Sequence, residues 1–144
     1  MPNKELIYKI LEKYWGYTGF RELQEDIIMS VLEGHDTLGL MPTGGGKSIT
    51  FQVPTLAMDG LAIVITPIIS LMKDQVDALQ ANGVKAEALN SSNDEYANRL
   101  IFDRCSRGEI KILYISPERL MAEITRLQKS VKVSMIAIDE AHCV

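Results

Sequence analysis

The chain has 144 residues, enough for one ordinary hydrophobic core, and its mixture of apolar and charged residues excludes the collagen-like, low-complexity and disordered classes. Its net charge is −4 and neither half is basic, so any contact with nucleic acid must come from a few placed groups. Cys105 and Cys143 form no CxxC pair and no disulfide framework, which favours a reducing, cytoplasmic compartment. The sequence has no apolar run near the ~20 residues of a membrane span and no signal-peptide pattern, so we expect no membrane contact.

The N-terminal part of the chain predicts two short helices. Apolar residues recur at helical spacing between Leu6 and Tyr14 and again between Leu23 and Leu32, and Gly34 ends the second pattern. A strand is then expected at 37–41, followed by a glycine-rich turn and a helix over 47–58. Trp15 and the scattered tyrosines and methionines are expected to be core residues.

Strands and helices alternate along the rest of the chain. Strands are expected at 61–65, 84–89, 111–115 and 133–138, and helices at 69–81, at 93–107 and from Pro117, with Ser116 as the N-cap. Five strands separated by helices indicate βαβ units, and therefore an α/β fold with a mostly parallel sheet and helices on both faces. The chain stops directly after a strand and an acidic turn, which is typical of a truncated domain.

The strongest local signal is Met41-Pro-Thr-Gly-Gly-Gly-Lys-Ser48, between a predicted strand and a predicted helix. Its backbone N–H groups can surround a phosphate, while the Lys47 ammonium reaches the β- and γ-phosphates and the Ser48 hydroxyl ligates Mg²⁺. The turn residues expected to bind the nucleotide are Thr43, Gly44, Gly45 and Gly46. Met41 stands where the general pattern has its first glycine, and a flexible glycine turn is the alternative.

An acidic segment, Asp139-Glu140-Ala141-His142, follows the last predicted strand. Parallel α/β sheets bind ligands at the carboxyl ends of their strands, so Asp139 is expected to hold Mg²⁺ and Glu140 to orient the attacking water. An acidic pair after a strand, taken alone, is more often a solvated turn. The Gly-Lys-Ser segment upstream favours a role for this pair in ATP hydrolysis instead. His142 and Cys143 are adjacent and have no zinc spacing, so we expect no metal other than Mg²⁺.

These segments together resemble the RecQ DNA helicases of helicase superfamily 2. Residues 41–48, Met41 included, resemble motif I of that family, and residues 139–144 resemble its motif II. Further segments resemble motif 0 (17–24), motif Ia (66–75), a short family block (89–91) and motif Ib (114–120). The resemblance covers nearly the whole chain and implies N-terminal helices with an adenine-recognition motif at 1–34, followed by an incomplete first RecA-like motor domain at 35–144.

The resemblance also implies roles for individual residues. Gln24 is expected to pair with adenine N6 and N7, Tyr17 to stack on the base and Arg21 to hold a neighbouring polar group, although an ordinary helix start is the alternative. His142 is expected to couple the γ-phosphate site to DNA binding, unless it is a packed turn histidine. Contacts with single-stranded DNA are expected from residues that follow two of the predicted strands: Thr66, Pro67, Ser70, Lys73, Gln75, Ser116, Pro117 and Glu118. Residues 116–118 can also cap the helix that follows them, and the two roles can coexist.

The implied function is that of an ATP-dependent DNA helicase that uses Mg²⁺ and unwinds duplex DNA from 3′ to 5′ in replication, recombination or repair. The implied partners are single-stranded and duplex DNA, and the second RecA-like domain and C-terminal regions of the same parent chain. A cytoplasmic protein of bacterial type, associated with the nucleoid when on DNA, is expected. The alternative is a P-loop switch or regulatory module that binds nucleotide without motor activity.

Overall fold

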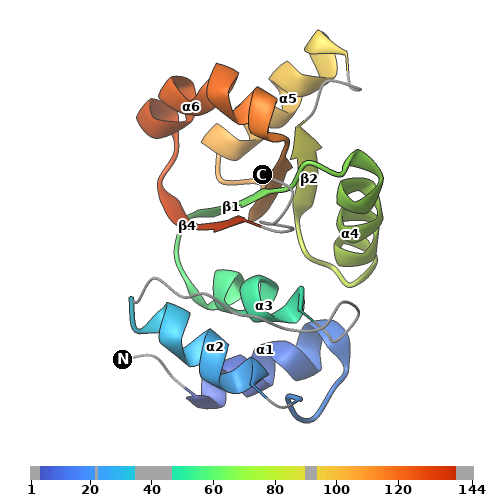
Figure 1. Cartoon of the computed structure of the whole chain (residues 1–144), viewed down its shortest axis with the longest axis vertical. Coiled ribbons are helices and arrows are strands. Elements are labelled where there is room, and N and C mark those ends of the chain that lie inside the picture. Colours follow the sequence, from blue (N-terminus) through green and yellow to red (C-terminus); the bar gives the residue numbers. More distant parts are fainter. Residues whose placement is uncertain (1–3, 22, 35–46, 90–93, 139–144) are drawn as a thin grey trace. The chain divides into compact units, whose positions relative to one another are not determined.

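The computed structural model describes residues 4–21, 23–34, 47–89 and 94–138, and the chain divides into two compact units, Met1–Asp59 and Gly60–Val144 (Figure 1). The described part of the first unit contains α1 (Lys4–Trp15), α2 (Gln24–Leu32) and α3 (Ile49–Ala57). That of the second contains β1 (Leu61–Ile65), α4 (Ile69–Ala81), β2 (Ala86–Leu89), α5 (Glu95–Ser106), β3 (Ile112–Ile115), α6 (Pro117–Ser130) and β4 (Val133–Ile138). The expected domain boundary between residues 34 and 35 stays a prediction, and the expected strand at 37–41 lies outside the described residues.

The three helices of the first unit share one apolar core. Ile7, Ile10 and Leu11 recur on one face of α1, as the helical period requires, and all three are buried. Ile28 of α2 and Val53 of α3 complete the buried cluster. The two N-terminal helices predicted from the apolar spacing are therefore confirmed.

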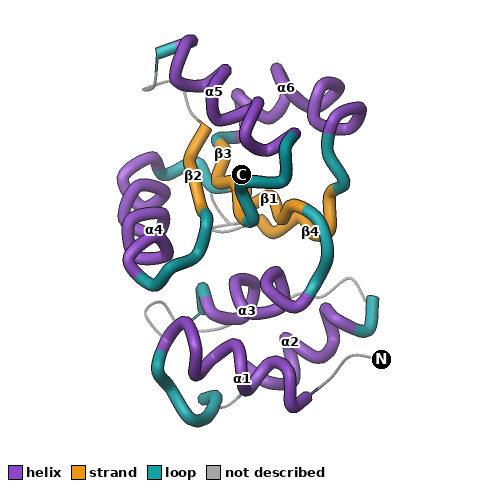
Figure 2. Tube along the Cα trace, turned by 180° about the vertical axis from the view of Figure 1, so that it is seen from behind, coloured by secondary structure: helices purple, strands orange, loops and turns teal. Residues whose placement is uncertain are grey.

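The described part of the second unit is built on a four-stranded sheet in which every strand pair is parallel, in the order β2-β3-β1-β4 (Figure 2). The inner strand β1 is apolar and buried at all five positions, as expected of a strand covered on both faces. The predicted α/β class with a mostly parallel sheet is therefore confirmed. The strands at 61–65 and 133–138 have the predicted bounds, whereas β2 and β3 each begin later than predicted.

Helices cover both faces of this sheet (Figure 1 and Figure 2). Leu113 of β3 faces the cluster that contains Phe102 of α5 and Leu127 of α6. The next residue along β3, Tyr114, points to the opposite face and donates a hydrogen bond to Gln75 of α4 at 2.5 Å. The expectation of helices on both faces is therefore confirmed. Among the described helices, none is long and apolar enough to cross a membrane.

The entry into β1 requires a glycine. Gly60 has a φ of +109°, and a Cβ atom placed there would lie 2.8 Å from the carbonyl oxygen of Lys132, the residue before β4. That same carbonyl accepts a hydrogen bond from the N–H of Leu61 at 2.8 Å, and the register between β1 and β4 shifts by one residue immediately afterwards. The close approach of the two backbones therefore begins the pairing of β1 with β4.

Candidate nucleotide and nucleic-acid site

The start of α3 presents two of the residues expected to bind phosphate and metal. The carbonyl oxygen of Lys47 accepts two hydrogen bonds from Thr50, one from its N–H at 3.1 Å and one from its hydroxyl at 2.5 Å. Ser48 has helical backbone angles, and its side chain makes no capping hydrogen bond to α3. The serine hydroxyl is a hard oxygen ligand of the kind that Mg²⁺ prefers, so this residue fits the metal. The other expected ligand, Asp139, lies outside the described residues, as do Glu140, His142, Thr43, Gly44, Gly45 and Gly46.

The expected base-recognition segment contains one buried amide between exposed side chains. Gln24, the first residue of α2, is only 2% exposed, and its Oε1 accepts a hydrogen bond from the backbone N–H of Arg21 at 2.7 Å. The Tyr17 ring is 55% exposed, and the Arg21 side chain is exposed as well. The structure therefore orients the Gln24 amide and leaves an aromatic ring accessible nearby in sequence; their contact with a base stays a prediction.

The residues that follow β1 and β3 come together at one edge of the sheet. The N–H of Thr66 donates to the carbonyl of Ile115 at 3.2 Å, and Ser116 follows directly. Thr66 and Ser116 are both buried, and the Ser116 hydroxyl caps α6 by accepting from the N–H of Arg119 at 3.3 Å. Pro67 and Pro117 are half-buried, while Ser70 and Glu118 are exposed. The predicted cap is confirmed, and the predicted DNA contacts of these residues stay predictions.

Two expected DNA contacts on α4 point in different directions. Gln75 is half-buried and its amide oxygen accepts from the fully buried Tyr114 of β3. Lys73 is exposed and lies 2.8 Å from the carboxylate of Asp77, whose hydrogen bond raises the pKa of the lysine. Gln75 is therefore hydrogen-bonded to β3 through its amide oxygen, whereas Lys73 faces solvent.

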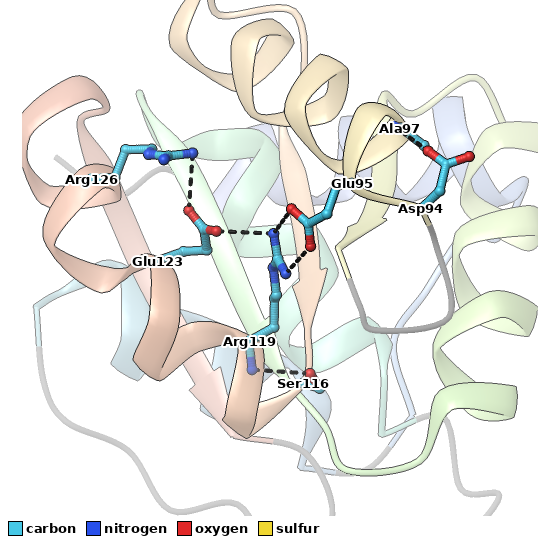
Figure 3. A network of polar contacts seen from close by, with 7 residues as sticks. All are labelled: Asp94, Glu95, Ala97, Ser116, Arg119, Glu123 and Arg126. Carbon is cyan, nitrogen blue, oxygen red and sulfur yellow. Dashed lines mark hydrogen bonds and ion pairs between the residues drawn. The ribbon is translucent and has the colours of Figure 1, made fainter.

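A network of charges between α5 and α6 was not predicted from the sequence (Figure 3). Arg119 of α6 reaches both carboxylate oxygens of Glu95 on α5, at 2.8 and 3.2 Å, and Glu123 on its own helix at 3.0 Å. Arg126 approaches the same Glu123 at 3.4 Å. The Arg119 hydrogen bond is the main cause that lowers the pKa of Glu95. Arg119 and Glu123 are four residues apart on a helix, and this spacing is the signal that predicts the ion pair between them. No such spacing predicts the pair of Arg119 with Glu95.

The described part of the chain offers no competing chemistry from thiols or clustered ligands. Cys105 is buried, and its burial raises the pKa of the thiol to about 12, so the reactive thiolate is scarce at neutral pH. No group of three or more histidine, cysteine, aspartate or glutamate side chains in the described residues could hold a metal ion.

Residues 21–144 match the family of DEAD/DEAH box helicases. This chain belongs to that family. It is 46% identical over 143 residues to the ATP-dependent DNA helicase RecQ of Haemophilus influenzae and 48% identical over 139 residues to that of Bacillus subtilis. These alignments cover 99% and 94% of the chain but 23% of each relative, so the chain spans about a quarter of their length.

A solved helicase structure has the same fold. The crystal structure of a hypothetical ATP-dependent RNA helicase from Sulfolobus tokodaii superimposes with a TM-score of 0.74, over 98% of this chain and 42% of that one, at 22% identity. The RecA-like fold expected for this DEAD/DEAH box helicase domain is therefore confirmed, as is its resemblance to RecQ helicases.

Proposed function

We propose that this chain is the first motor domain of a RecQ-type DNA helicase, which uses ATP hydrolysis to unwind duplex DNA from 3′ to 5′ in replication, recombination or repair. The observation that carries the proposal is the 46% identity to a protein named ATP-dependent DNA helicase RecQ, over 99% of this chain. The family match over 21–144 supports the use of ATP. The protein would act in the cytoplasm, on the nucleoid, together with a second RecA-like domain and C-terminal regions of its parent chain.

The nucleotide would bind at the start of α3. The Lys47 ammonium would pair with the β- and γ-phosphates, and the N-terminal end of the helix adds partial positive charge. Ser48 and Asp139 would hold Mg²⁺, which when bound neutralises charge on the phosphate oxygens. Glu140 would orient the attacking water, and His142 would couple this site to bound DNA.

The adenine base would be recognised by the segment before α2. Tyr17 would stack on the base, Arg21 would hold a neighbouring polar group, and the Gln24 amide would donate to N7 and accept from the N6 amine. Guanine carries O6 in place of that amine, so it cannot form the same pair, and we expect ATP to bind more tightly than GTP. Binding of both nucleotides to the wild-type protein and to Gln24→Ala tests this assignment. An unchanged preference in the variant would show that another group reads the base.

Single-stranded DNA would lie across the edge where β1 and β3 end. Thr66 and Ser116 lie next to each other there, and α4 and α6 begin within a few residues of them. The backbone N–H groups of such helix starts favour phosphates, and exposed Ser70 and Lys73 add polar and charged contacts. The chain as a whole is acidic, so these placed groups rather than bulk charge would hold the strand.

The decisive experiment compares ATP hydrolysis with and without single-stranded DNA, on the protein at its full natural length. A motor that moves on DNA must couple the two, so we expect DNA to stimulate hydrolysis and a tailed duplex to be unwound. A P-loop switch has no reason to respond to DNA. Hydrolysis at the same rate with and without the strand, and no unwinding, would favour that alternative.

A further inference from the structure

Helix α1 contacts both the segment before α2 and the first turn of α2. The Tyr8 hydroxyl donates a hydrogen bond to the carboxylate of Glu25, the residue that follows Gln24. The ring of Tyr8 also meets the ring of Phe20 edge to face, with the centroids 5.0 Å apart. Phe20 precedes Arg21, so one side chain of α1 contacts the chain on either side of Arg21 and Gln24, two of the residues expected to contact the base.

A second side chain of α1 reaches the same carboxylate. Lys4 Nζ lies 3.1 Å from Glu25, but the lysine side chain is 66% exposed, and such ion pairs contribute little to stability. The side chain of Glu25 is only 27% exposed, and the hydrogen bond from the Tyr8 hydroxyl is the main cause that lowers the pKa of its carboxyl. The half-buried Tyr8 is therefore the more specific of the two contacts.

The backbone between these two contacts is strained. Leu23 has a φ of +69°, and among the described residues it is the only one other than glycine with a positive φ. Bulky residues rarely adopt this conformation, because it costs free energy. The Leu23 side chain is 53% exposed, so burial of its apolar surface offsets little of that cost. The turn closes through two hydrogen bonds between Arg21 and Gln24, from the Gln24 N–H to the Arg21 carbonyl at 3.1 Å and from the Arg21 N–H to Gln24 Oε1 at 2.7 Å.

We propose that Tyr8 is a positioning residue for base recognition, which holds the strained Leu23 turn through Glu25 and Phe20 so that the Gln24 amide keeps one orientation. The inference rests on the proposed function, because it takes Gln24 as the residue that contacts adenine. Tyr8 itself acts only through its neighbours. When this contact is lost, the turn relaxes and the amide samples other orientations, which weakens the pairing with the base and leaves the phosphate contacts in place.

The test measures the dissociation constants of ATP and GTP on the full-length protein with Tyr8→Phe, which keeps the ring and removes the hydroxyl. We expect the preference for ATP to fall several-fold, toward the value of Gln24→Ala, while GTP binding stays unchanged. Tyr14→Phe is the matched control, because Tyr14 lies on the same helix and its ring packs against Trp15, with centroids 6.2 Å apart. This control should keep the wild-type preference.

A second measurement follows the turn itself. Tyr8→Phe should speed hydrogen exchange at the Arg21 and Gln24 amides relative to those inside α2, and adding Leu23→Gly should restore ATP preference, because glycine adopts a positive φ without strain. Equal loss of ATP and GTP binding in Tyr8→Phe would indicate a general loss of stability and overturn the inference. An unchanged preference in Tyr8→Phe, with a lost preference in Gln24→Ala, would overturn it and leave the proposed function intact. An unchanged preference in Gln24→Ala would reject the base assignment, and the inference with it.

Discussion

Thr50 fixes the backbone at the point where the Lys47 side chain leaves the chain. Both hydrogen bonds from Thr50 end on the Lys47 carbonyl, and Thr50 itself is buried. The peptide plane between Lys47 and Ser48 is therefore held before any ligand arrives. Such preorganisation reduces the entropy lost when a phosphate binds.

Removing the Lys47 charge tests the phosphate site. Lys47→Ala should weaken ATP binding about 10- to 100-fold, because a hydrogen bond to a charged group contributes about 1.5–3 kcal/mol, and it should abolish hydrolysis by the full-length protein. Lys9→Ala is the control, since Lys9 is 72% exposed and pairs with Glu5 four residues away on α1. Turnover near the wild-type rate in Lys47→Ala would contradict the site assignment.

Motif resemblance located the segment expected to recognise the base, but it did not predict the geometry of that segment. The left-handed Leu23 is the reason, because leucine has no local preference for that conformation. The hydrogen bonds on either side of it, from Tyr8 to Glu25 and from Arg21 to Gln24, join residues that no regular period relates. Motif spacing therefore locates Gln24, whereas the hydrogen bond that its amide oxygen accepts from Arg21 became visible only in the structure.

The positions of helices and strands along the chain could be predicted from the sequence more fully than their arrangement in the fold. The bounds of α4, β1 and β4 and the Ser116 cap agree with local signals of period, capping and β-branched residues. The strand order was not predicted, because β1 and β3 are similar apolar runs and nothing local specifies their neighbours. The link from α5 to α6 was missed for the same reason, since Glu95 and Arg119 are 24 residues apart.

That link predicts a measurable loss of stability. Arg119→Ala removes both contacts to Glu95 and leaves Glu123, whose side chain is 10% exposed, with Arg126 as its ion-pair partner among the described residues. We expect a cost of about 2 kcal/mol in the free energy of unfolding. Arg119→Lys should recover little, because an ammonium cannot bind both oxygens of a carboxylate in parallel. Urea denaturation measures the effect. Arg126→Ala removes one ion pair of 3.4 Å and the contact of the guanidinium with the Phe102 ring, 5.0 Å from its centroid, and should cost less.

The pH dependence of this effect follows from Glu95. Its pKa is lowered from the ordinary value of 4.5 in the folded chain, so its contribution to stability is present above that value and is lost as the pH falls through the folded pKa. The stability difference between wild type and Arg119→Ala should therefore shrink below pH 4.5. A difference that stays constant from neutral to strongly acidic pH would contradict the role of the Glu95 pair.

The junction of β1 and β4 gives a second prediction for the sheet. Gly60→Ala should cost about 3 kcal/mol, because it combines a positive φ with a Cβ only 2.8 Å from a backbone oxygen that cannot move without breaking the pairing. Gly83→Ala is the matched control: its φ is +88°, but nothing lies within 4 Å of the added Cβ, so it should cost about 1 kcal/mol. Equal losses in the two variants would show that backbone strain alone, and not the close approach, sets the requirement.

For the whole molecule, we predict that a polypeptide of residues 1–144 binds ATP weakly, hydrolyses it negligibly and unwinds nothing. The chain spans about a quarter of the length of its RecQ relatives, and in phosphoryl-transfer motors an arginine supplied from outside the P-loop contributes about 10³ to 10⁵ in rate. Nucleotide titration, phosphate release and unwinding of a tailed duplex measure the three expectations. Robust unwinding by this polypeptide would contradict the two-domain mechanism.

The position of β1 between β3 and β4 has a consequence for synthesis on the ribosome. β1 is made before the other described strands, yet its partners are β3 and β4, and Ala62 pairs with Met135, about 70 residues later in the chain. At about 5–20 residues per second, this apolar strand waits several seconds for its second neighbour. The apolar segment Leu61–Ile65 therefore lacks its β4 neighbour during this interval, and slower translation between β3 and β4 would increase the risk of aggregation.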